Sequence, residues 1–156
     1  MAWAFMAKTE PSLRARAMRF LARREHSREE LRRKLAARAG EGDDVEAILD
    51  DLANRGWLSD ARFAEISIRS KAGRYGPVKL AHALRSKGVD EEAIAAGFRA
   101  AGADGASHVE AVWATRFKAV PVDERERGRQ VRFLQARGFR LDEVLQFLRR
   151  MEREKP

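Results

Sequence analysis

The sequence contains no cysteine and only three histidines among its 156 residues. Without thiols there is no disulfide framework and no thiolate chemistry, which agrees with a reducing compartment. His26, His82 and His108 lie far apart, and none has a second histidine at helical spacing, so a zinc site is not expected. We therefore expect no bound metal and no cofactor.

Long apolar runs are also missing, because no segment approaches the roughly 20 residues that cross a bilayer. The opening stretch MAWAFMAKTE has no basic leader, no long apolar region and no small-residue cleavage site. We therefore expect a cytoplasmic protein without membrane attachment, in which residues 1–11 form a frayed or disordered tail.

The common catalytic motifs are absent as well: there is no Ser–His–Asp order, no glycine-rich phosphate loop and no nucleophile elbow. The acidic pairs Asp43/Asp44 and Asp50/Asp51 could hold divalent ions in a nuclease. Their positions at the start of a predicted helix and on its exposed side favour capping and solvent roles instead. We expect a protein that is not an enzyme.

Positive charge, by contrast, is abundant. The 32 Lys and Arg residues exceed the 24 Asp and Glu residues, which gives a net charge of +8 and a pI near 10.5. Arginine supplies most of this charge, and its planar fork suits phosphate and carboxylate. The balance favours an anionic partner, either nucleic acid or an acidic protein surface. For most of these side chains a solvated helix face is the simpler interpretation.

Apolar residues recur at helical spacing along the whole chain, and no segment alternates as a strand would. Residues 45–52 carry apolar side chains at positions i, i+3, i+4 and i+7, and residues 141–148 repeat this spacing. Ser27 and Glu30 match a helix capping box, whereas Arg140 is a poor cap that costs on the order of 1 kcal/mol. The sequence predicts an all-α fold.

The predicted helices fall into three similar units. Gly40, Gly88 and Gly138 each follow the second helix of a group of three, at a spacing of about fifty residues. Tandem helical repeats contact their neighbours in sequence and are often elongated and curved. We predict three three-helix repeats, residues 12–55, 56–103 and 104–156, that form an elongated, curved array.

The corner between the first two helices of the middle repeat carries Tyr75 between Arg74 and Gly76. An aromatic ring at such a corner could stack on a base or fill a protein groove. The simpler interpretation is that the ring packs into the core of the repeat. In the third repeat we expect Pro121 to end the first helix, and we expect Trp57 and Trp113 to pack in a core or between repeats.

The basic clusters and this tyrosine are the candidate contacts with a protein or nucleic-acid partner. They are Arg23, Arg24, Arg32, Arg33 and Lys34 in the first repeat, Lys71, Arg74, Tyr75, Lys79, Arg85 and Lys87 in the second, and Arg137 in the third.

Four groups of residues, in this order, resemble the RecX family, the small helical regulators of the RecA recombinase. They are FLARREHS at 20–27 with ELRRKL at 30–35, GWLSDARFA at 56–64, YGP at 75–77 with Leu84, Lys87 and Gly88, and FLQARGF at 133–139. The chain departs from the family pattern where Ala83 replaces a commonly acidic residue, where Arg140 replaces a small cap, and where no glycine follows Phe117.

The resemblance implies three tandem three-helix repeats and a non-enzymatic regulatory role in recombination, DNA repair and the SOS response. Members of the family bind the RecA–DNA filament, lie along its groove, and damp its ATP hydrolysis, strand exchange and co-protease activity. It implies that the partner is the RecA nucleoprotein filament, with weak direct binding to DNA. We expect a monomer.

The alternative is a DNA-binding repeat protein that acts without a recombinase, its three-helix units serving as helix-turn-helix readers. Binding to free DNA with a steep salt dependence would favour this alternative.

Overall fold

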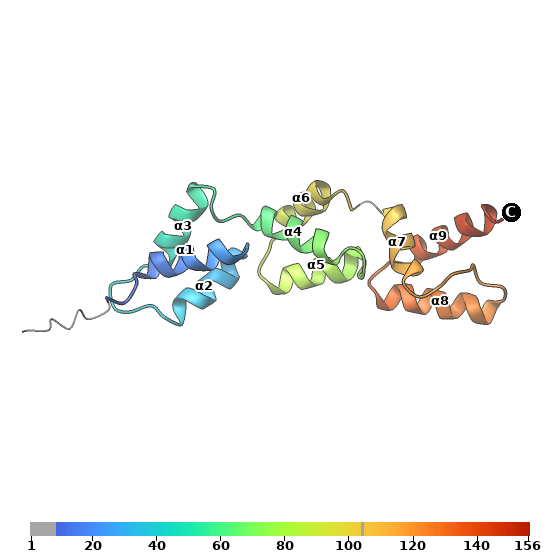
Figure 1. Ribbon diagram of the computed structural model, residues 1–156, viewed down its shortest axis with the longest axis horizontal. Coiled ribbons are helices and arrows are strands. Elements are labelled where there is room, and N and C mark those ends of the chain that lie inside the picture. The colour runs from blue at the N-terminus through green and yellow to red at the C-terminus, as the bar shows by residue number, and fades with distance from the viewer. Residues whose placement is uncertain (1–8, 104) are drawn as a thin grey trace, which may run out of the picture. The chain divides into compact units, whose positions relative to one another are not determined.

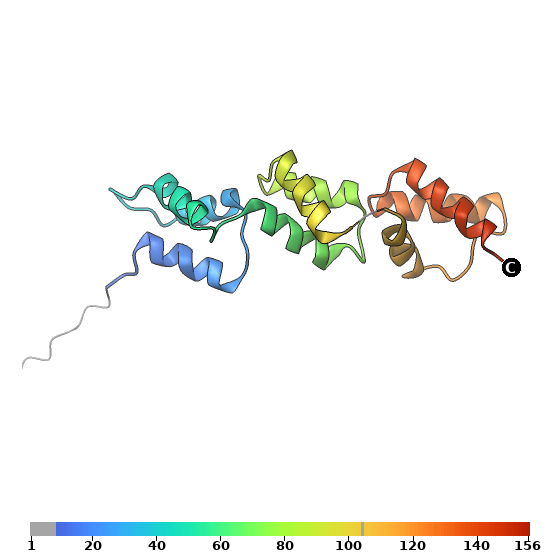
Figure 2. The same ribbon diagram turned by 90° about the horizontal axis from the view of Figure 1, so that it is seen from above.

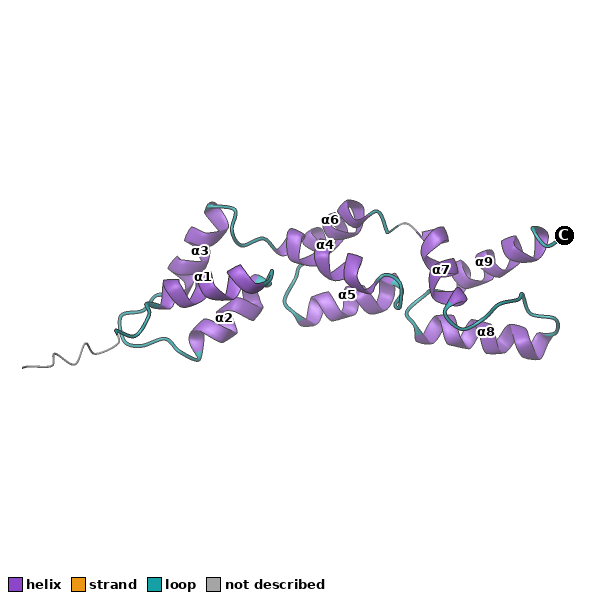
Figure 3. Ribbon diagram, viewed as in Figure 1, coloured by secondary structure: helices purple, strands orange, loops and turns teal. Residues whose placement is uncertain are grey.

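The computed structural model describes residues 9–103 and 105–156, and in these ranges it contains nine α-helices and no strand (Figure 3). The helices are α1 (Leu13–Arg23), α2 (Arg28–Ala36), α3 (Val45–Asn54), α4 (Asp60–Lys71), α5 (Pro77–Ser86), α6 (Glu91–Ala101), α7 (Gly105–Ala114), α8 (Glu124–Ala136) and α9 (Leu141–Arg153). The predicted all-α fold is confirmed. Of the predicted tail, residues 1–8 lie outside the described residues, and residues 9–11 precede α1.

The chain divides into two compact units, the first up to Ser59 and the second from Asp60 onwards. The first contains α1 to α3 and the second α4 to α9 (Figure 1). Three separate hydrophobic clusters lie among α1–α3, α4–α6 and α7–α9, which confirms the grouping in threes. We retain residues 12–55, 56–103 and 104–156 as proposed limits of the repeats. None of the described helices combines the length and apolar character that a membrane span requires.

The core of the first repeat consists of aliphatic side chains from all three helices: Leu13, Ala17, Leu31, Leu35, Leu49, Leu52 and Leu58 are buried together. Local caps define where the helices begin. The Ser27 hydroxyl accepts the Glu30 N–H (3.1 Å), and the Asp44 carboxylate accepts the Ala47 N–H (3.1 Å). These bonds satisfy backbone donors that have no partner inside the helix.

His26 is buried beside this core, with only 1 % of its surface exposed. Its Nδ1 lies 3.0 Å from the Arg24 carbonyl, and its Nε2 lies 2.8 Å from Lys34 Nζ. Because the ammonium of Lys34 can only donate, Nε2 must accept and Nδ1–H must donate, so the ring is neutral. Burial lowers the pKa of His26 below its ordinary 6.5, and the charges of Arg24 and Lys34 act in the same direction.

In the second repeat, α4 and α6 pack closely because α6 carries Gly97 at the contact (Figure 2). A Cβ at Gly97 would lie 2.6 Å from the Cβ of Ala64, so any larger residue would force the helices apart. Phe63, Ile68, Leu80, Leu84 and Ile94 are among the residues buried between α4, α5 and α6.

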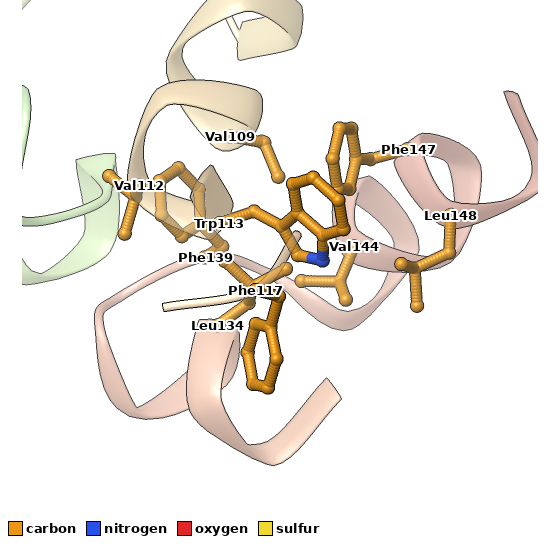
Figure 4. Packing of buried hydrophobic residues seen from close by; sticks show 9 residues of the cluster. All are labelled: Val109, Val112, Trp113, Phe117, Leu134, Phe139, Val144, Phe147 and Leu148. Atoms are coloured by element: carbon orange, nitrogen blue, oxygen red, sulfur yellow. The ribbon is translucent and has the colours of Figure 1, made fainter. Parts of the chain in front are cut away.

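The core of the third repeat is the most aromatic. Figure 4 shows Trp113 close to Phe117, Val144 and Phe147, all of which are buried. The expectation that Trp113 lies in a core is confirmed. Trp57, in contrast, is 43 % exposed, with the Arg55 guanidinium 5.4 Å from its ring, so of its two expected places the one in a core was wrong.

The first helix of the third repeat ends at Ala114, earlier than the predicted break at Pro121. The chain that follows α7 is held by the buried side chain of Gln130. Its Oε1 accepts the Trp113 Nε1–H (2.8 Å), and its Nε2 donates to the Ala119 carbonyl (3.1 Å). These bonds satisfy the buried amide of Gln130 and tie the loop to α8.

Within the second unit, the last two repeats meet at two glycines. The Gly76 N–H donates to the Arg137 carbonyl (2.7 Å), and the Val78 N–H donates to the Gly138 carbonyl (3.0 Å). A Cβ at Gly76 would lie 2.5 Å from the Gly138 oxygen, and Gly138 itself has φ +102°. The close approach therefore requires glycine at both positions. We call this contact the glycine joint.

The stability of the first repeat should fall in mild acid because of His26. Since its folded-state pKa is lowered, its stabilising contribution is complete above the ordinary value of 6.5 and is lost as the pH falls through the folded-state pKa. We expect the melting temperature to fall by a few degrees between about pH 8 and about pH 5.5. His26→Gln, which keeps a donor and an acceptor but does not titrate, should reduce this fall. An unchanged pH profile in the variant would contradict the assignment.

The glycine joint can be tested with two substitutions in one loop. Gly76→Ala should destabilise the second unit by about 1–3 kcal/mol, because the added methyl overlaps the Gly138 carbonyl. Gly73→Ala is the matched control, since a Cβ there meets nothing within 4 Å. Its effect should stay within about 0.5 kcal/mol. Equal urea midpoints for the two variants would show that the joint is not tightly packed.

Candidate partner-binding surface

The glycine joint brings two predicted basic corners together around the ring of Tyr75. The Arg74 guanidinium lies 5.9 Å, the Lys79 ammonium 5.2 Å and the Arg137 guanidinium 5.8 Å from the ring centroid. The ring is half-buried against the core of the second repeat, as the simpler interpretation of Tyr75 expects, and its contact with a base or a protein groove stays a prediction. We call Arg74, Tyr75, Lys79 and Arg137 the tyrosine corner.

Bonds across the joint hold these cations in place. Arg137 donates from its guanidinium to the Arg74 carbonyl (3.2 Å), and Lys79 Nζ donates to the Ala136 carbonyl (3.4 Å). His108 of α7 bonds the Tyr75 carbonyl through Nε2 (2.8 Å). A ring face attracts cations through its quadrupole. Lys79 and Arg137 are thus oriented by backbone carbonyls and by the ring, whereas the Arg74 guanidinium contacts the ring alone.

None of Arg74, Lys79 and Arg137 forms an ion pair with another described residue, so their charge is available to a partner. A phosphate or carboxylate placed there would meet cations of which two are already oriented by backbone carbonyls. Such preorganisation reduces the entropy lost on binding.

Rings and arginines continue from this corner along α8. Arg137 also lies over Phe133 (5.1 Å), Arg116 lies over the same ring (5.7 Å), and Phe133 meets Phe117 edge-on (5.2 Å). Arg129 lies over Phe117 (5.7 Å). We call this series the α8 stripe. The sequence candidates included only Arg137 from it, although the density of arginine in residues 125–132 was a usable signal.

Three arginines on α8 also line a hollow of about 520 Å³. They are Arg125, Arg129 and Arg132, and the hollow also contains Asp123 and Glu126. Because Arg129 pairs with Glu126 (3.2 Å) and the Asp123 carboxylate caps α8, the charge of the hollow is mixed.

In the first repeat, by contrast, several of the candidate arginines form ion pairs. Arg24 pairs with Glu30 (2.5 Å), Arg33 pairs with Glu29 (3.3 Å), and Arg32 pairs with both Glu29 and Glu46. Hydrogen bonds from Arg32 and then Arg28 lower the pKa of Glu46 to about 2. Exposed ion pairs of this kind contribute little stability. Their effect here is to neutralise much of the charge that the sequence placed on α2.

The remaining candidates lie on separate surfaces. Arg23 is exposed, Lys34 lies between His26 and the Phe20 ring (4.9 Å), and Arg85 pairs with Glu91 (3.0 Å). Lys71 and Lys87 line a hollow between α4 and α5. From the predicted set the structure therefore brings together Arg74, Tyr75, Lys79 and Arg137 and, at a separate site, Lys71 and Lys87.

The acidic pairs considered for a nuclease serve the fold. The Asp43 carboxylate accepts the Gly40 N–H (2.8 Å), and Asp44 caps α3. Asp50 pairs with Arg28 (2.5 Å), and Asp51 pairs with Arg14 (2.6 Å). In the part of the chain that the structure describes, no group of three acidic or histidine side chains could hold a metal ion.

Fold and surface together define a tandem three-helix repeat protein with an ordered cationic corner. Two family models match it, described as the first three-helix domain of RecX over residues 14–52 and the second over residues 59–97. The chain is 46 % identical to the regulatory protein RecX of Ralstonia nicotianae, over 82 % of this chain and 80 % of that one. It is 42 % identical to RecX of Leptothrix cholodnii over 96 % of each chain. The chain belongs to the RecX family.

Solved structures agree with the fold. The crystal structure of RecX from Lactobacillus salivarius superimposes with a TM-score of 0.71 at 18 % identity, covering 90 % of this chain and 94 % of that one. A second crystal structure, of regulatory protein RecX, gives a TM-score of 0.72 at 19 % identity over 88 % and 71 % of the two chains.

Proposed function

We propose that this protein modulates, and mainly inhibits, the RecA recombinase by binding the RecA–DNA filament in the cytoplasm. Binding damps ATP hydrolysis, strand exchange and co-protease activity, without chemistry of the protein's own. Membership of a family of regulatory proteins supports the general role. The tyrosine corner is the observation that carries the more specific one, because it gathers three cations around one ring, with no ion-pair partner among the described residues.

A filament suits a repeat protein because both are periodic. Several weak contacts along one chain, each with a neighbouring subunit, act at high effective concentration once the first has formed. A monomer with three repeats therefore needs no single strong site. The tyrosine corner would supply one such contact, with a carboxylate of the recombinase or a phosphate of its DNA.

This proposal predicts how charge removal acts on RecA. Replacing Arg74, Lys79 and Arg137 with Ala should raise the concentration needed to inhibit RecA ATP hydrolysis on single-stranded DNA at least about tenfold. Removing the same charge from exposed positions elsewhere, with Arg19, Arg38 and Arg99 changed to Ala, should raise it less than about threefold. Thermal melting of both variants checks that they are folded. Equal inhibition by the two triple variants would exclude the tyrosine corner as the contact.

Direct DNA binding is the second candidate, and the arginines of the α8 stripe favour it, since arginines contact phosphates and the partly exposed ring of Phe133 lies among them. Fluorescence anisotropy of a labelled oligo-dT at increasing salt measures this binding. The filament proposal expects weaker affinity for bare oligo-dT than for a RecA filament on the same oligonucleotide. Equal or tighter binding to the bare strand would favour the second candidate.

A further inference from the structure

A hollow opens between α4 and α5, on the second repeat. Its floor is apolar and consists of Phe63, Ile68, Leu80 and Leu84, which are core residues no more than 8 % exposed. Its edge carries Lys71, the last residue of α4, and Lys87, the residue that caps the end of α5. Two cations therefore border an opening into the hydrophobic core of the repeat.

The size of the hollow limits what can enter it. Its volume is about 50 Å³, several times what one water molecule requires and well below the roughly 150 Å³ of a cavity that binds benzene. The tip of a Val, Leu or Ile side chain fits this space, whereas an aromatic ring or a nucleobase does not. The floor offers aliphatic and aromatic carbon, which favours an apolar group over a polar one.

The charge at the edge of the hollow indicates which residues of the partner flank the inserted side chain. None of the residues that line the hollow is acidic. Lys71 forms no ion pair with another described residue, and it is exposed. A carboxylate on the partner would gain a charge-assisted contact with Lys71, and an approaching phosphate backbone would offer no side chain to fill the floor.

We propose that the hollow between α4 and α5 binds an acidic segment of a protein partner, which inserts one aliphatic side chain onto the apolar floor and places a carboxylate against Lys71. Under the proposed function this segment belongs to the recombinase. Only the identity of the partner rests on the proposed function, and the site itself does not. The surface is separate from the tyrosine corner in its chemistry: it recognises protein, whereas the corner accepts any oxyanion.

The first experiment blocks the opening of the hollow. Ala83 is exposed on α5 and lines the hollow, so Ala83→Phe adds a ring that is too large to enter and that covers the opening without removing a core residue. Ala95→Phe, on an exposed face of α6, is the matched control. Ala83→Phe should weaken binding to a RecA filament formed on oligo-dT at least about tenfold, and Ala95→Phe should not. Equal affinities of the two variants, both folded by thermal melting, would overturn the proposal.

Charge reversal gives a second variant of the same test. Lys71→Glu should weaken filament binding, whereas Lys118→Glu, an exposed lysine in the third repeat, should weaken it less. Binding of bare oligo-dT separates protein from nucleic acid. Ala83→Phe should leave it unchanged, and an equal loss of affinity for bare DNA would overturn the assignment to a protein segment.

The second experiment needs no recombinase, so it separates this proposal from the proposed function. The probe is the capped pentapeptide Glu-Glu-Leu-Glu-Glu, titrated to millimolar concentration into the ¹⁵N-labelled full chain. We expect shifts of the amide resonances of Ser67, Ile68 and Leu84, and smaller shifts with Glu-Glu-Ala-Glu-Glu. The absence of shifts, or equal shifts with both peptides, would overturn the hollow as an acidic-peptide site even if RecA inhibition is observed. Shifts with the leucine peptide but no filament binding would overturn only the recombinase as partner.

Discussion

The candidate surface depends on the contact between Gly76 and Gly138. Two backbone hydrogen bonds cross it, and no side chain larger than hydrogen fits between the segments. This contact brings the corner after α4 to the corner after α8, although Arg74 and Arg137 are 63 residues apart. Because main-chain atoms form it, the positions of the attached cations are set by the backbone rather than by flexible side chains alone. The ordering of the tyrosine corner is therefore a consequence of packing between repeats.

The positively charged side chains fall into two groups, according to what they contact. Many arginines of the first repeat meet Glu or Asp at hydrogen-bond distance, as Arg24 and Arg28 do. At the tyrosine corner the cations meet a ring and backbone carbonyls, which orient a cation without cancelling its charge. The net charge of the chain is thus a poor guide to where an anion binds. An anion is expected to bind where the cations have no carboxylate beside them.

The fold was largely predictable because its signals are local. Apolar spacing depends only on the helical period, and caps such as Ser27 act on residues three positions away. The end of the first helix of the third repeat was misplaced, because the apolar spacing continues through Phe117 and Val120 although α7 ends at Ala114. The exposure of Trp57 was missed for another reason, because a single aromatic residue carries no period.

The sequence by itself determined the helices, their grouping in threes and the surplus of arginine, since periodicity, caps and composition are properties of neighbouring residues. The family could also be identified from motifs along the chain. Only the tertiary structure decided which cations are paired, which surround Tyr75, and which border an apolar hollow. Such pairings join residues tens of positions apart, and their energies depend on distances that packing between helices sets.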